Sequence, residues 1–149
     1  MQFIIDKVKK LRFGWNERPL GEADFYRLCR RFKVTVTEMP LRVGGFYYSV
    51  IGRHHIAIDS GLPEREKLFV MFHELGHFLL HVPAAGVTAN FHGIGTKTRV
   101  ENEADIFALC SLLPRHILEH HDAAELLETE GLGEEKIAAR FAVFEKYGI

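Results

Sequence analysis

Cysteine is scarce in this chain, with only Cys29 and Cys110 among its 149 residues. The two lie far apart, each within a segment that we expect to be helical. They therefore form neither a disulfide framework nor a CxxC metal or redox motif. We expect both to be reduced, buried thiols.

The sequence also lacks an excess of charge of either sign. It contains 19 Lys and Arg residues against 20 Asp and Glu residues, which gives a formal net charge of -1 at pH 7. No overall field then attracts the protein to nucleic acid or to anionic lipid. We therefore expect neither a direct nucleic-acid partner nor a membrane partner.

Long hydrophobic runs, repeats and low-complexity tracts are absent as well. Residues 1–6 lack both the basic start and the apolar run of a secretory signal, and no window approaches the length of a membrane span. We expect a cytoplasmic protein. Because 47% of the residues are apolar, a chain of this length can bury the core of one domain, which we expect to span residues 1–149.

Apolar periodicity and turn residues predict an α+β fold, in which a small three-stranded antiparallel sheet packs on a helical bundle. The opening segment, to residue 19, gives no clear prediction. A long loop without periodicity follows the second helix, and loops of that length are more often functional than structural. The predicted helices cover residues 21–32, 64–82, 101–113 and 134–147, with one or two short helices between 115 and 134; the strands cover 34–39, 46–51 and 55–59, and the loop covers 83–100.

The second of these helices contains the sequence His73-Glu74-Leu75-Gly76-His77. Two histidines four residues apart on a helix are separated by about 40° around the axis and about 6 Å along it, so both imidazoles can face one point. Such a pair suits zinc. Glu74 lies on the flank of the same face, where its carboxylate can act as a general base on a water molecule.

Two simpler interpretations of this pentapeptide remain. The helix could lie at the surface, or it could be a core helix whose histidines are hydrogen-bonded. The flanking residues 69–72 and 78–80 are apolar and would bury the helix. Because burying His73, Glu74 and His77 without partners is costly, this context favours a metal site.

A catalytic zinc needs a third protein ligand. Metzincins take it from a histidine ten residues after the first one, but Pro83 stands at that position here, and Leu80 replaces their glycine. The metzincin class is therefore excluded, and the third ligand has to come from another helix.

The predicted helix at residues 101–113 supplies a candidate, because Glu101 and Asp105 share one of its faces. We expect Glu101 to bind zinc and Asp105 to accept the free ring N–H of His73 or His77. Glu103 is a reserve ligand. Without the histidine pair, Glu101 would be read as an acid favoured by the dipole at a helix N-terminus.

The remaining histidines are weaker candidates. His81 lies two turns after His73, where it no longer shares the helix face of His73 and His77, and we expect it to interact with the helix dipole. His92 could line the cleft or help to stabilise an oxyanion. We read the pairs His54-His55 and His120-His121 as solvated turn residues. The further candidates for oxyanion stabilisation are Tyr47, Tyr48 and Arg99.

Five short segments of the chain match a known set of motifs. They are residues 56–59 (IAID), 62–63 (LP), 72–81 (FHELGHFLLH), 101–108 (ENEADIFA) and 112–114 (LLP). Their combination resembles the ImmA/IrrE metallopeptidases, over about residues 20–120. The resemblance implies a minimal gluzincin core there, which leaves residues 115–149 as a C-terminal helical extension.

Residue by residue, the resemblance implies that His73, His77 and Glu101 are zinc ligands and that Glu74 is the catalytic base. It also implies a substrate class, since characterised relatives cleave a helix-turn-helix repressor and so switch on phage, mobile-element or stress genes. Many relatives have Leu-Leu-Met-Pro where this chain has Ser111-Leu112-Leu113-Pro114. Many also have Asn at the position of Asp105. Neither departure touches the expected ligands.

The sequence thus predicts a zinc-dependent endopeptidase, with Mn²⁺ or Fe²⁺ as other possible ions. The expected partner is a DNA-binding repressor encoded nearby. An alternative is a zinc-stabilised module that sequesters a regulatory partner without proteolysis, and only Glu74 argues against it. A third interpretation, helix-turn-helix DNA binding, rests on Arg27, Arg30, Arg31 and Lys33, but such a run is usually a solvated face.

Overall fold

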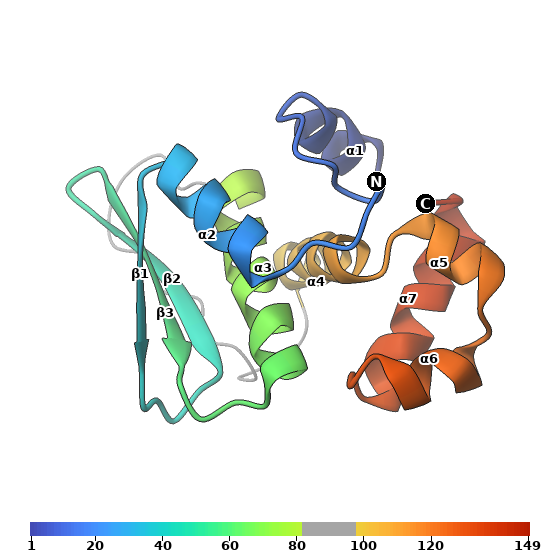
Figure 1. Cartoon of the computed structure of the whole chain (residues 1–149). Helices are drawn as coiled ribbons and strands as arrows, with labels where there is room; N and C mark the ends of the chain where they lie inside the picture. The colour runs from blue at the N-terminus through green and yellow to red at the C-terminus, as the bar shows by residue number, and fades with distance from the viewer. Residues whose placement is uncertain (82–97) are drawn as a thin grey trace.

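The computed structural model describes residues 1–81 and 98–149, which form a three-stranded sheet and seven helices (Figure 1). The predicted α+β class is confirmed. The strands are β1 (Val34–Met39), β2 (Gly45–Val50) and β3 (Arg53–Asp59); the helices are α1 (Gln2–Lys9), α2 (Glu22–Arg31), α3 (Glu64–His81), α4 (Arg99–Leu112), α5 (Arg115–His120), α6 (Ala123–Thr129) and α7 (Glu134–Tyr147).

The sheet is mixed, so the prediction of an antiparallel sheet is wrong for one of its two strand pairs. The strand order is β1-β3-β2: β2 pairs antiparallel with β3, whereas β1 pairs parallel with β3. Consecutive strands are neighbours about two times in three, and β1 and β2 are an exception. The buried run Ile56-Ala57-Ile58 in β3 fits its central position.

The connection from β1 to β2 passes around the end of β3, and Asp59 holds it there. The backbone N–H of Leu41 donates to Asp59 Oδ1 at 3.1 Å, and the N–H of Asp59 donates to the carbonyl of Gly44 at 2.8 Å. A Cβ atom on Gly45 would lie 2.8 Å from the carbonyl oxygen of Ala57. Only glycine therefore lets β2 start this close to β3.

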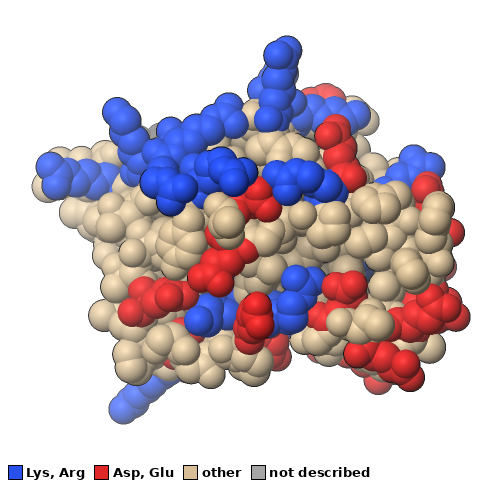
Figure 2. Space-filling model, in the orientation of Figure 1, with Lys and Arg blue, Asp and Glu red and all other residues tan. Residues whose placement is uncertain are grey.

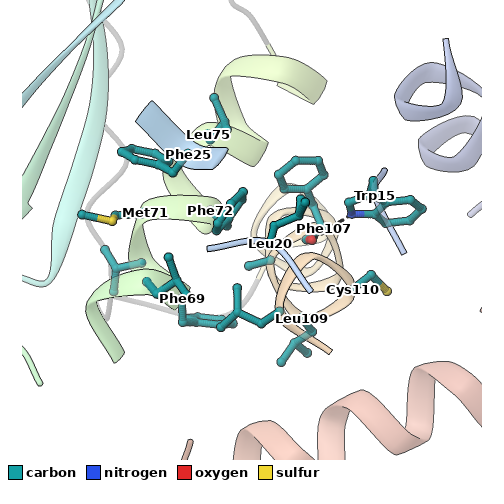
Figure 3. Packing of buried hydrophobic residues seen from close by; sticks show 14 of the residues in the cluster. Trp15, Leu20, Phe25, Phe69, Met71, Phe72, Leu75, Phe107, Leu109 and Cys110 are labelled. Atoms are coloured by element: carbon teal, nitrogen blue, oxygen red, sulfur yellow. Dashed lines mark hydrogen bonds between the residues drawn. The ribbon is translucent and has the colours of Figure 1, made fainter. Parts of the chain in front are cut away.

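The main core lies where α3 meets α2, α4 and the inner face of the sheet (Figure 3). Phe25 of α2 packs edge-on against Phe72 of α3, with ring centroids 5.9 Å apart. The segment after α1 joins this core, since Trp15 stacks on Phe107 of α4 and donates from Nε1 to the Phe107 carbonyl at 3.0 Å. The opening segment, which gave no prediction, thus supplies both a helix and part of the core.

Element boundaries agree closely with the predictions. α4 begins two residues earlier than predicted because Thr98 caps it, accepting a hydrogen bond from the N–H of Glu101. The last helix is confirmed at Glu134–Tyr147. Cys29 and Cys110 are buried free cysteines, as predicted.

The C-terminal helices α5 to α7 pack beyond the end of α4 (Figure 1). Arg140 of α7 is fully buried and joins three segments: its guanidinium donates to the carbonyls of Leu113 and Ile149 and to Oδ1 of Asn16. Within residues 1–81 and 98–149, no helix is both long and apolar enough to cross a membrane.

Candidate metal centre

The close approach of α3 and α4 creates the site. Gly76 lies on the face of α3 that meets α4, where an added Cβ atom would be 3.0 Å from Cδ1 of Phe107 and 3.4 Å from Cα of Ala104. Because neither Gly76 nor Ala104 carries a long side chain, the two backbones lie nearly in contact. The carboxylates of α4 can then reach the histidines of α3.

Three side chains converge between the two helices. The ligand atoms of His73, His77 and Glu101 all lie within 4.8 Å of one another. The two Nε2 atoms are 3.1 Å apart, and Glu101 places Oε2 at 3.1 Å from Nε2 of His73 and Oε1 at 3.0 Å from Nε2 of His77. Ligands of a tetrahedral zinc ion at roughly 2.1 Å would be about 3.4 Å apart, so these residues fit such an ion after a small outward shift.

Asp105 lies one turn after Glu101 on α4 and orients the first histidine. Its Oδ1 is 2.7 Å from Nδ1 of His73. A ring N–H donated from Nδ1 to Asp105 would leave Nε2 of His73 to bind a cation. Burial alone would lower the pKa of His73, but the hydrogen bonds to Asp105 and Glu101 outweigh it and raise this pKa to about 9. The site thus attracts positive charge strongly, whether as a proton or as a cation.

Glu74 is fully buried beside this cluster. Neither of its carboxylate oxygens has a hydrogen-bond partner among the described residues, although buried polar groups are nearly always paired. Burial raises the pKa of Glu74 to about 8, and Glu101 and Asp105 add to the rise, while His73 and the backbone of Tyr47 oppose it. A carboxylate of this kind can take up and release a proton near neutral pH.

The structure places the reserve ligand Glu103 away from the three-residue cluster. Its Oε2 atom lies 2.7 Å from Nε2 of His81, and its Oε1 atom accepts a hydrogen bond from Nε of Arg99 at 2.7 Å. His81 is therefore held by Glu103 across the two helices, a contact that sequence reasoning missed. The sequence offered one indication of this contact: Glu103 lies two residues after Glu101 on the same helix and therefore points in a different direction.

The candidates on the sheet lie differently from the predictions. His54 and His55 belong to β3, so their interpretation as turn residues is wrong. Nδ1 of His54 is 2.8 Å from the hydroxyl of buried Tyr47, and His55 stacks on Tyr48 with ring centroids 4.7 Å apart. His120 is exposed but is the last residue of helix α5, so its interpretation as a turn residue is wrong as well. His121 follows the helix, is exposed and pairs with Glu125. His92 and the loop at residues 83–97 lie outside the described residues.

Comparison with known proteins adds to this geometry. The model of a peptidase family, described as the IrrE N-terminal-like domain, matches residues 29–146. A protein named "Uncharacterized immunity region protein 2", from Bacillus phage phi105, is 30% identical over 102 residues, which cover 67% of this chain and 65% of that protein. The chain thus spans slightly less than two thirds of that relative. No solved structure matches the chain.

Proposed function

Because the chain belongs to the IrrE N-terminal-like domain family of metallopeptidases, we propose that it is a zinc-dependent endopeptidase. The observation that carries the proposal is the buried, unpartnered carboxylate of Glu74 beside the His73, His77 and Glu101 cluster. A site that held zinc only for stability would have no use for such a carboxylate.

His73, His77 and Glu101 would hold the ion. When bound, Zn²⁺ supplies Lewis acidity that activates a water molecule and polarises the scissile carbonyl. Glu74 takes a proton from the attacking water and passes it to the leaving amine. Asp105 keeps the ring of His73 in the orientation and tautomer that the site requires.

The substrate proposed here is a helix-turn-helix transcriptional regulator. The ImmA/IrrE resemblance supports this substrate class, and the immunity-region name of the phage relative agrees with a role in gene control. Cleavage of such a repressor would switch on the phage, mobile-element or stress genes that it silences. The partner would then be a protein encoded near this gene.

The edge strand β2 offers a place for an extended substrate. Strand β3 cannot accept it, because β3 is the central strand and both of its edges are occupied. β2 is an edge of the sheet, and the backbone of its residue Tyr47 lies close enough to influence Glu74. A peptide added to β2 by strand pairing would therefore pass near the general base.

The test is to combine the purified protein with the helix-turn-helix regulator encoded beside its gene and to follow cleavage by mass spectrometry. The wild type should produce two fragments. Glu74→Gln should retain zinc and lose cleavage by roughly 100-fold or more. Glu64→Gln, the same change in the exposed first turn of α3, is the matched control and should cut normally.

Cleavage by Glu74→Gln at the wild-type rate would overturn the proposed mechanism. An intact, stoichiometric complex between the wild type and the regulator would instead support the module that sequesters its partner. Metal analysis of protein purified without added salts identifies the ion, since manganese or iron could also occupy two histidines and a carboxylate.

A further inference from the structure

The near-zero net charge of the chain hides a strong separation of charge. The first 33 positions hold nine of the 19 Lys and Arg residues but only four of the 20 acidic residues, whereas positions 115–149 hold four basic and eight acidic residues. Figure 2 shows the result in space, with Lys and Arg side chains gathered along the upper edge and acidic side chains at the lower right. The two ends of the molecule therefore carry opposite charge.

Helix α2 supplies the centre of this basic surface. Arg27, Arg30 and Arg31 are exposed and fall within about 100° of the helix circumference. The opposite side of α2 buries Phe25 and Cys29 in the core. Core packing thus fixes which way the arginines face.

A hollow of about 420 Å³ lies beside these arginines. The guanidinium of Arg31 donates to the carbonyl of Leu11 at 2.6 Å, which joins the end of α2 to the segment after α1. Asp24 partly neutralises the hollow through ion pairs with Arg18 and Arg27. The hollow is lined by Arg12, Phe13, Gly14, Glu17, Arg18, Asp24, Arg27, Leu28 and Arg31.

The sheet extends the surface past α2. Val34 of β1 pairs with His54 of β3 in parallel register, so the preceding residues Lys33 and Arg53 lie side by side at the same end of the sheet. Both are exposed. We call the following set the basic face: Lys9, Lys10, Arg12, Arg18, Arg27, Arg30, Arg31, Lys33 and Arg53.

Most charges of the basic face are available to a partner. Among residues 1–81 and 98–149, the only ion pairs that its members form are those of Arg18 and Arg27 with Asp24. The other seven cations are exposed and form no ion pair in these ranges, although Glu17 lines the hollow with Arg12. They repel one another, and a polyanion would relieve that repulsion.

We propose that the basic face binds the phosphate backbone of duplex DNA. Contacts to phosphates require only cations spread over several sites, and they need no apolar surface. The sequence-based expectation of no nucleic-acid partner rested on net charge, which does not describe a surface on which the charges are separated. The interpretation of Arg27, Arg30, Arg31 and Lys33 as a solvated face changes accordingly.

The composition of the face disfavours the other two classes of anionic partner. The centre of a protein–protein interface is depleted in charge, whereas six of the nine residues that line the hollow are charged. Stable attachment to a bilayer needs a broad apolar side to insert. The exposed apolar side chains near the face are Ile51 and Val50, 97% and 38% exposed beside Arg53, and Phe3 of α1, 51% exposed. These three are too few to form such a side.

The basic face lies near the metal centre, which suggests what DNA binding would do. The ammonium of Lys7, in the helix that leads to Lys9 and Lys10, donates to the carbonyl of Leu80 at 3.2 Å, so α1 lies against the last turn of α3. His77 is less than one turn further back along α3. This role rests on the proposed function: DNA on this face would bring a regulator bound to that DNA close to the metal centre.

The experiment measures binding of the full chain to a fluorescein-labelled 20-base-pair duplex by anisotropy, without any cleavage step. Wild-type affinity should fall steeply with salt; five phosphate contacts would give a log–log slope of about -4.5. Arg30→Gln/Arg53→Gln should weaken binding about tenfold at low salt and reduce the slope by about 1.8.

The matched control is Arg42→Gln/Lys146→Gln, which removes the same charge from exposed positions that are not part of the basic face, one after β1 and one in α7. It should bind like the wild type, and circular dichroism should show that both double variants are folded. The absence of salt-dependent binding would overturn the proposal, as would equal loss in the two double variants. The proposal would also be overturned if poly-glutamate, at equal charge, competed as effectively as unlabelled DNA. Binding to phosphatidylserine vesicles in place of DNA would overturn it as well.

Discussion

Oδ1 of Asp105 lies 2.7 Å from Nδ1 of His73, across the contact between α4 and α3. Asp105→Ala should lower zinc affinity 10- to 100-fold, roughly the usual cost of losing the group that orients a metal-binding histidine. Asp105→Asn should retain most of the affinity, because an amide oxygen still accepts the ring N–H. Competition with a chromogenic zinc chelator measures all three proteins, and equal affinities for Ala and Asp would contradict an orienting role.

Two acids two residues apart on α4 should differ in their effect on metal content. Glu101→Gln removes a carboxylate from the three-residue cluster, so the protein should purify with far less than one equivalent of zinc. Glu103→Gln removes a partner of His81 and Arg99 and should leave the zinc content near one equivalent. Metal analysis by mass spectrometry decides between them. The reverse pattern would identify Glu103 as the ligand.

The stability of the metal-free protein should depend on pH. The pKa of Glu74 rises from 4.5 to about 8, chiefly through burial. The pKa of His73 rises from 6.5 to about 9, because its contacts with Asp105 and Glu101 exceed the opposing effect of burial. Each folded-state pKa lies above the unfolded value, so each group's stabilisation is complete below the unfolded pKa and is lost as pH rises through the folded pKa.

Thermal unfolding in the presence of a chelator tests this expectation. The unfolding midpoint should fall as pH rises from about 5 to about 9, the range that spans both shifts. Glu74→Gln should flatten the dependence because its amide does not titrate. A midpoint that increases over this range would contradict the assignment of the two protonated groups.

The start of β2 should tolerate no side chain. Gly45→Ala would place Cβ 2.8 Å from both the carbonyl oxygen of Ala57 and Cγ1 of Val70, and it should cost about 1–3 kcal/mol in the free energy of unfolding. Gly61→Ala, whose Cβ would lie 3.7 Å from Asp59, is the control and should be nearly neutral. Urea denaturation measures both variants. Equal stabilities would show that β2 can shift away from β3.

Local patterns predicted the helix of the site well. The spacing of His73 and His77 depends only on helix geometry, and the apolar residues around them indicate burial wherever the helix packs. Glu101 likewise lies in a helix whose start depends on a local contact, the cap formed by Thr98. Such features need no knowledge of the rest of the fold.

The strand order depends on contacts that sequence does not display. The 40–44 connection wraps past Asp59, so that β1 and β2 lie on opposite edges of β3, and Gly45 allows the close approach of β2. Both causes become visible only when the strands are side by side. The basic face has the same origin, since Leu11 and Arg31 are 20 residues apart in the chain and meet only in the folded protein.

The contact at Gly76 also bears on which ions the centre can accept. A Cβ atom added to Gly76 would lie 3.4 Å from Cα of Ala104, so α3 and α4 are separated there by little more than their own backbones. Helices in such contact cannot move closer, and the packed core around Phe72 resists their separation. The backbone spacing between the helices that carry the histidines and Glu101 is thus short and nearly fixed. It favours ions of small radius over calcium, whose oxygen ligands lie at about 2.3–2.6 Å and number six to eight.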